Sequence, residues 1–203
     1  MLRLLTFSFL SFFLSMESYS QLLPSMVGAA IKKSSGVSSD TWDSSTKATC
    51  ITLSNGNLTS LESNCGNAWN SVYGSTGVSS GINEWEITIN AYNNVNDNVY
   101  DVMVGVATSR DNPNKHFQNG SVGYGYILQN GGIYHNGFSN YGASYGVGDI
   151  IKISLNSDTN QLTFYKNGYK ALTEQDIPRT KTREASKYLN LCCIHLVNQI
   201  SNE

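Results

Sequence analysis

The sequence predicts an all-β protein built as an antiparallel β-sandwich, preceded by an N-terminal leader. Three observations carry this prediction. Apolar and polar residues alternate with a period of two from Ile51 onward, turn residues recur between the alternating segments, and no long helical pattern appears among them. At 203 residues, the chain is long enough for one domain with its own buried core.

Residues 1–20 differ from the rest and have the pattern of a secretory signal peptide. Arg3 precedes an apolar run from Leu4 to Leu14, and small polar residues lead to a cleavage site before Gln21. The run is shorter than the roughly 20 apolar residues of a membrane span, so no stable span is expected. Two other interpretations stay open, a translation start at Met16 or a short buried helix. Cleavage would make the protein secreted; the alternative is a cytoplasmic protein.

Residues 21–41 are expected to form a connector, and the domain is expected to cover residues 42–203. Apolar residues between Leu22 and Ile31 have helix-like spacing, but Pro24 and Gly28 weaken it. The sequence therefore predicts a short helix here, or no regular element.

From Trp42 the sequence predicts a series of strands and tight turns. "ATCITLS" and "NLTSLES" flank the turn Ser54–Asn57 as a first hairpin. "NEWEITINAY" alternates, so one face of this strand is buried and the other is wet. "VYDVMVGVAT" is an apolar strand, and "GYGYILQ" and "GIYHNG" flank the turn Asn130–Gly132. Trp42, Trp69 and Trp85 are interpreted as core residues.

The segment 148–168, "GDIIKISLNSDTNQLTFYKNG", predicts the most regular hairpin of the chain. Apolar residues alternate on both strands, and residues 156–160 supply the turn between them. Asn167-Gly168 suits a type I′ turn because both residues tolerate a positive φ. One hairpin is barely stable alone, so its apolar face must cover a second sheet.

Composition excludes several classes of partner and site. The formal net charge is −2, and only 14% of residues are charged. The sequence contains no basic stripe that could displace counterions from phosphate, so no nucleic-acid partner is expected.

The cysteines leave the compartment open. Cys50 and Cys65 flank the first hairpin and can pair if the chain is secreted, but no cysteine or histidine spacing indicates zinc. The sequons at Asn57 and Asn119 would accept glycans in the secretory route, but such triplets are also frequent by chance in an Asn-rich chain. No metal or cofactor is expected.

Five motifs in register resemble the SPRY domain, called B30.2 in its longer form. They are "SSGINEWEITI", "MVGVAT", "GYGYILQNGGIYHNG", "YGVGDIIKISLN" and "QLTFYKNG". The resemblance covers about residues 42–197. It implies a bent β-sandwich of the concanavalin-like jelly-roll type that binds a protein or short peptide through loops at one end and does no chemistry. The segment "LNLCCIHLV" resembles the family's penultimate strand, so the closing strand is expected to be missing or replaced.

The expected binding residues lie in two loops and the last strand. In the peptide-binding branch of the family an aromatic residue follows the "VGVAT"-like strand, which implies His116, Phe117 and Asn119 here; the alternative for Phe117 is a plug in the sandwich end. The loop 139–146 is rich in Tyr and Asn, which suit adaptable contacts. It adds Asn140 and Tyr141, although its tyrosines can instead pack on the sheet, Tyr145 more so than Tyr141. His195 is expected near the same end.

Two other functions are alternatives to the interaction module. A secreted, lectin-like sandwich that binds glycans is the alternative favoured by the leader and the Tyr/Asn-rich loop. An enzyme is not expected, because no nucleophile-elbow motif surrounds any serine and "GSVGYG" opens a strand instead of a helix. Glu84 and Glu86 are interpreted as the wet face of a strand, not as a carboxylate pair for hydrolysis.

Overall fold

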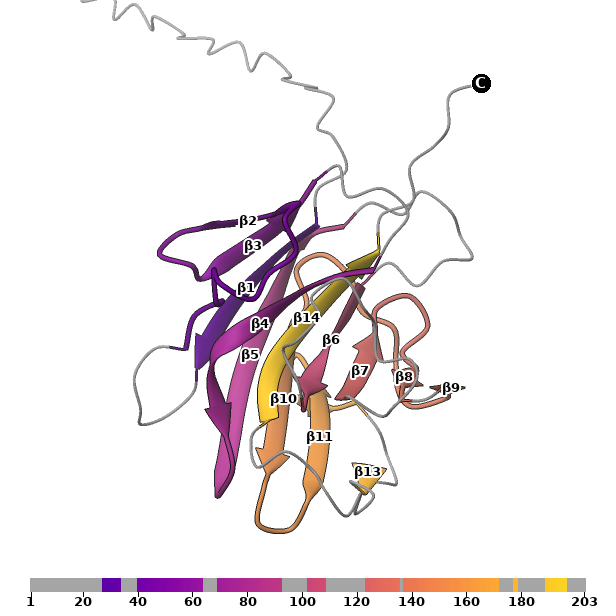
Figure 1. Cartoon of the computed structure of the whole chain (residues 1–203). Coiled ribbons are helices and arrows are strands. Elements are labelled where there is room, and N and C mark those ends of the chain that lie inside the picture. Colours follow the sequence, from indigo (N-terminus) through magenta and orange to yellow (C-terminus); the bar gives the residue numbers. More distant parts are fainter. Residues whose placement is uncertain are drawn as a thin grey trace, which may run out of the picture.

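The computed structural model of the protein describes residues 27–33, 40–63, 69–92, 102–108, 123–135, 137–171, 177–178 and 189–196. For 27–33, 177–178 and 189–196 the description is limited to the backbone. Every helix or strand assigned in these residues is a β-strand, and the strands form two antiparallel sheets (Figure 1). The predicted all-β sandwich is therefore confirmed.

The larger sheet has eight strands, with β2 at one edge and β12 at the other. In spatial order they are β12 (Tyr169–Lys170), β11 (Gln161–Lys166), β10 (Ile150–Asn156), β5 (Ile82–Ala91), β1 (Val27–Lys33), β3 (Thr59–Glu62) and β2 (Ile51–Ser54), and β13 (Ile177–Pro178) pairs with β11 beside this path.

The smaller sheet has six strands, with β4 and β9 at its edges. In spatial order they are β4 (Trp69–Val78), β14 (Leu189–Leu196), β6 (Val102–Ala107), β7 (Gly123–Ile127), β8 (Ile133–Tyr134) and β9 (Phe138–Ser139).

The core lies between the two sheets and follows the alternation of the strands. The larger sheet contributes every second residue of β5 and β10, and these residues are fully buried because each strand presents one face inward. The smaller sheet contributes valines of β6 and tyrosines of β7. Burial of each such side chain stabilises the fold by about 1.5–3 kcal/mol. The core also contains Trp42 and Trp85, as predicted, whereas Trp69 is partly buried beside a smaller second cluster.

The predicted hairpin of residues 148–168 is present as β10 and β11. Ile153 pairs with Phe164 and Leu155 pairs with Leu162, and all four side chains are buried. Residues 167 and 168 both have positive φ, 50° and 83°, as a type I′ turn requires. This second turn joins β11 to β12, with Lys166 opposite Tyr169, whereas residues 157–160 connect β10 to β11.

The expectation of a helix or no element in the connector 21–41 is wrong for residues 27–33, which form β1. This strand lies in the middle of the larger sheet, between β5 and β3, with Ile31 opposite Ile87 and Ala30 opposite Thr59. Its sequence, "VGAAIKK", has little β-branched character, so local propensity did not reveal it. Pairing on both sides supplies the stability that propensity does not.

The last described strand, β14, does not lie at a sheet edge. It pairs with β4 on one side and β6 on the other. A closing strand was expected to be missing or replaced. In the described residues, β14 is the second strand of the smaller sheet, inside the edge strand β4, and is paired on both sides.

Candidate functional site

The pairing register of β6 decides which of the predicted binding loops share an end of the sandwich. Val102, the first residue of β6, pairs with His195, and the backbone N–H of Leu128 donates to the Val102 carbonyl at 2.9 Å. Ala107, the last residue of β6, pairs with Gly123. The two ends of this strand lie roughly 17 Å apart, because an antiparallel strand rises about 3.4 Å per residue.

Three predicted binding residues lie outside the described residues: His116, Phe117 and Asn119. The described residues nearest their loop are Thr108 and Gly123, at the Ala107 end of β6. His195 lies at the Val102 end, and its side chain is not described. The structure therefore separates the start of the 109–122 loop from His195 along the sheet.

Asn140 and Tyr141 open a segment, residues 140–149, that joins β9 of the smaller sheet to β10 of the larger one; we call it the connecting loop. It runs along the Val102 end, because the N–H of Tyr145 donates to the Leu128 carbonyl at 2.9 Å. The N–H of Gly142 donates to the Gly131 carbonyl at 2.7 Å. The connecting loop and His195 therefore share an end of β6, and the described residues that flank the 109–122 loop lie at the other end.

Aromatic side chains attach the connecting loop to the core. Tyr145 is only 4% exposed, and its hydroxyl donates to the Tyr126 carbonyl at 2.7 Å, so it is a core residue. Tyr141 is half-buried and meets the rings of Tyr126 and Phe164 edge-on, at centroid distances of 5.6 and 5.8 Å. The N–H of Phe164 donates to the Tyr141 hydroxyl at 3.3 Å. The ring of Tyr141 is thus packed against the core, while part of the residue stays exposed to solvent.

Tyr126 holds the middle of the connecting loop through its hydroxyl, which donates to the Ala143 carbonyl. Burial, with smaller contributions from nearby Tyr141 and Asp149, raises the pKa of Tyr126 to about 12. The hydroxyl therefore stays protonated, and remains a donor, at every physiological pH.

Asp149 closes the connecting loop with a network of polar contacts. Its carboxylate accepts hydrogen bonds from the N–H of Gly146 at 2.8 Å and from the side chain of Asn167 at 2.7 Å. Lys166 forms an ion pair with it at 3.1 Å and also donates to the Ser144 carbonyl at 2.9 Å. Partial burial alone would raise the pKa of Asp149, but these donors together lower it. The connecting loop is thus fixed to the β11–β12 turn.

Two exposed aromatic residues flank the connecting loop, one on each sheet edge. Phe138 of β9 is 45% exposed, and its ring lies over Gly132, where a Cβ atom would collide with it. Tyr169 of β12 is 81% exposed and pairs with Lys166, so it stands on the same face as the lysine that reaches the loop. We call the group formed by Phe138, Asn140, Tyr141, Tyr169 and Lys170 the edge surface.

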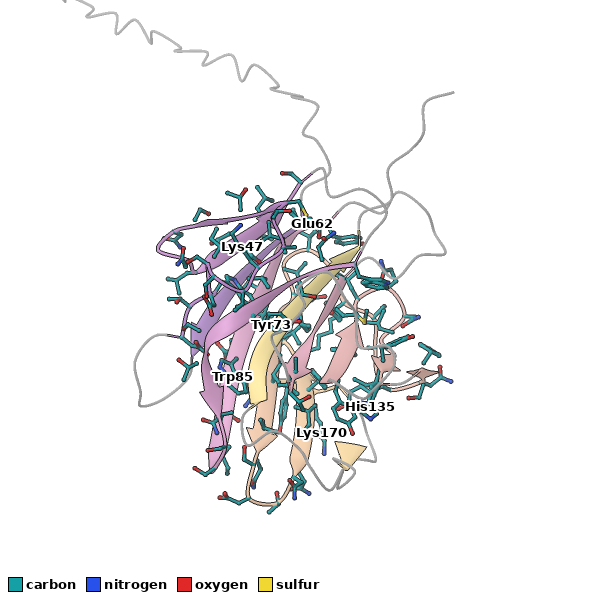
Figure 2. All side chains as sticks on the ribbon, viewed as in Figure 1. Lys47, Glu62, Tyr73, Trp85, His135 and Lys170 are labelled. Carbon is teal, nitrogen blue, oxygen red and sulfur yellow. The ribbon has the colours of Figure 1, made fainter. Side chains whose placement is uncertain are left out.

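The edge surface spans the gap between the edges of the two sheets. Gly142 of the connecting loop packs against the backbone of Ala171, directly after β12. Figure 2 shows Lys170, a residue of the edge surface, well separated from Glu62. The ring of His135 stacks on Tyr124 at 3.8 Å and its Nδ1 lies 2.7 Å from the Gly123 carbonyl oxygen, so its contacts are with the sheet.

The described residues hold no cluster of metal-ligating side chains, and Glu84 is engaged in an ion pair. No group of three or more metal-ligating side chains occurs among them. Glu84 forms an ion pair with Lys152 at 3.2 Å on the outer face of the larger sheet, as expected for the wet side of a strand. No membrane-spanning helix of sufficient length and hydrophobicity occurs in the part of the chain that the structure describes.

Sequence reasoning missed Phe138 and Tyr169 as candidates. Both lie in two-residue strands, too short to show a period. The one usable signal for Tyr169 is its place directly after the Asn167-Gly168 turn, because a residue after a hairpin turn can start an edge strand.

Comparison with known proteins supports the fold and identifies the family. Residues 83–192 match the SPRY domain. The structure is similar to the crystal structure of the SPRY domain of human HERC1, with a TM-score of 0.55 and 23% sequence identity over 78% of this chain and 91% of that one. No curated protein matches the sequence.

The match to the family and the β-sandwich fold support the same family assignment. The matched residues run from β5 into β14 and include the β10–β11 hairpin. Proteins with this domain are generally interaction modules that bind other proteins. The chain belongs to the SPRY domain family.

Proposed function

We propose that the chain is a non-enzymatic interaction module that binds a protein or short peptide through the edge surface. The observation that carries the proposal is the placement of exposed Phe138 and Tyr169 on either side of a connecting loop that is held in place by its own contacts. Aromatic side chains contribute much of the energy of protein interfaces, and a fixed loop loses little entropy on binding. Asn140 and Tyr141 supply polar contacts between them.

A displayed library of random peptides, used as the probe, tests this proposal. Peptides enriched on the full chain are expected to bind the double variant Phe138→Ala/Tyr169→Ala at least tenfold more weakly, a loss of about 1.4 kcal/mol. Asn140→Ala is expected to have a smaller effect. The matched control is Ile82→Ala, because Ile82 is also exposed (68%) but begins β5, next to the β10–β11 turn, at the other end of that hairpin from the connecting loop.

A further variant, Phe117→Ala, shows whether the loop 109–122 takes part. If the edge-surface variants bind as tightly as the unmodified chain while Phe117→Ala loses binding, the site lies in that loop and the edge surface is rejected. Isothermal titration calorimetry with a single enriched peptide gives each affinity, and the circular dichroism spectrum of each variant shows that it has folded.

A further inference from the structure

The turn of the β2–β3 hairpin carries an acceptor sequence for N-linked glycans, Asn57-Leu58-Thr59. Asn57 is partly exposed, and Asn55, Gly56 and Asn57 all have positive φ, at 52°, 63° and 63°. Its backbone carbonyl accepts a hydrogen bond from the N–H of Trp42 at 2.8 Å, and its side-chain amide makes no hydrogen bond within the described residues. The amide nitrogen is therefore available for modification.

A second observation indicates the compartment in which that modification occurs. Cys50, the residue before β2, is disulfide-bonded. Cys65, its predicted partner, lies outside the described residues. Disulfides form and persist in the secretory route and outside the cell, and are rare in the cytosol. The same route supplies the enzymes and donors of N-glycosylation.

We propose that Asn57 is an N-glycosylation site of the protein on its way through the secretory pathway, with residues 1–20 as the entry signal. The donor is a lipid-linked oligosaccharide pyrophosphate. The Asn57 amide nitrogen forms a bond to C1 of the first sugar and loses one proton, while the bond from C1 to the pyrophosphate oxygen breaks and the lipid pyrophosphate leaves with the electron pair. No oxidant or reductant is consumed.

The place of the glycan in the fold has a physical consequence. β2 is an edge strand of the larger sheet, and an unprotected edge can pair with a strand of another molecule. A bulky, hydrated glycan on the turn next to β2 blocks such pairing. The edge surface includes residues of β12, at the opposite edge of the same sheet from β2, so the glycan leaves this surface open. Figure 1 shows β2 well separated from β11, the strand next to β12.

Expression of the full chain in eukaryotic secretory cells tests the proposal. The Asn119→Gln background removes the second sequon, so that one glycan reports on Asn57 alone. We expect a single step in gel mobility that peptide N-glycosidase removes, and mass spectrometry of the released peptide should find Asp at the former Asn57 position. Asn55→Gln is the matched control, because Asn55 lies in the same turn with positive φ but outside the sequon.

Thr59 provides variants that leave the strained Asn57 backbone unchanged. Thr59→Ala is expected to abolish the mobility step, and Thr59→Ser is expected to keep it, because the acceptor sequence needs a hydroxyl at this position. A protein that is exported with oxidised Cys50 and bare Asn57 overturns the proposal, and so does a chain that never enters the secretory route. Neither result affects the proposal that the edge surface binds a peptide, because peptide binding is measured in a separate experiment.

Discussion

Glu62 is a fully buried carboxyl group between the two sheets. It lies on β3 and its Oε1 accepts a hydrogen bond at 3.1 Å from the side chain of Asn70 on β4, so the contact joins one sheet to the other. Burial raises the pKa of Glu62 to about 8, although the hydrogen bond from Asn70 lowers it in part. The folded protein therefore keeps this group protonated near neutral pH, because a buried carboxylate without full compensation is costly.

We predict that stability falls as the pH rises from about 4.5 to about 8, the interval between the ordinary and the raised pKa of Glu62. In that interval the folded state holds a proton that the unfolded state has released, so unfolding becomes easier with each step in pH. The loss is on the order of 1.4 kcal/mol per unit of pKa difference. Chemical denaturation at a series of pH values measures it.

Glu62→Gln is expected to remove this slope and to gain stability relative to the unmodified chain as the pH rises. The control is Glu86→Gln, which removes a carboxylate from the half-exposed outer face of β5. If the Glu62→Gln protein keeps the full slope, another group is responsible.

The face of β3 that points to the core could not be predicted from the sequence of the strand. In "TSLE" the apolar residue is Leu61, and alternation alone would bury it. Instead Ser60 and Glu62 are buried and Leu61 is half-exposed. The cause is the pairing of Glu62 with Ile51 on β2, because paired residues share a face and Ile51 belongs to the core.

At the scale of elements, the connecting loop depends on a close approach to β12. A Cβ atom at Gly142 would run into the carbonyl group of Ala171, with the carbonyl carbon at 2.9 Å. A Cβ atom at Gly146 would meet only the ring of Tyr92, at an ordinary 3.7 Å. The two glycines of one loop therefore differ in how they tolerate a methyl group.

We predict that Gly142→Ala destabilises the protein by about 1–3 kcal/mol, the usual cost of overpacking, and weakens peptide binding. Because the loop must move away from β12, Phe138 and Tyr169 lose their spacing. Gly146→Ala is the control and is expected to change neither property by much. Thermal unfolding and calorimetry report both, and equal behaviour of the two variants would show that the loop is not constrained at Gly142.

Elements with strong local signals could be predicted from the sequence. The β10–β11 hairpin has alternation on both strands and turn residues between them, and the Asn167-Gly168 turn follows it with the expected positive φ, so both form where expected. β8, β9 and β12 have two residues each, too few for any period, so the edge surface they frame was found only in part. Asn140 and Tyr141 were predicted from loop composition and not from a strand pattern, and their role in binding stays a prediction.

At the scale of the whole molecule, β1 joins two parts of the larger sheet. On one side it pairs with β5, and through β5 with β10 and β11; on the other it pairs with β3, which carries β2. Its neighbours are far apart in sequence, so no local pattern could reveal its role. We propose that the domain begins at β1 and not at Trp42.

This boundary predicts the behaviour of two shortened chains. A chain that starts at Asp40 lacks β1, so β5 and β3 lose the partner between them. Each lost hydrogen bond is worth about 0.5–1.5 kcal/mol, and together they approach the typical total stability of about 5–15 kcal/mol. We therefore expect this chain to be unfolded or to aggregate through its bare strands. A chain that starts at Gln21 lacks only the leader and is expected to unfold at the temperature of the longer protein. Circular dichroism with thermal unfolding compares the two chains. If the chain that starts at Asp40 unfolds cooperatively at an unchanged midpoint temperature, β1 is not part of the folded domain and residues 21–41 are a connector.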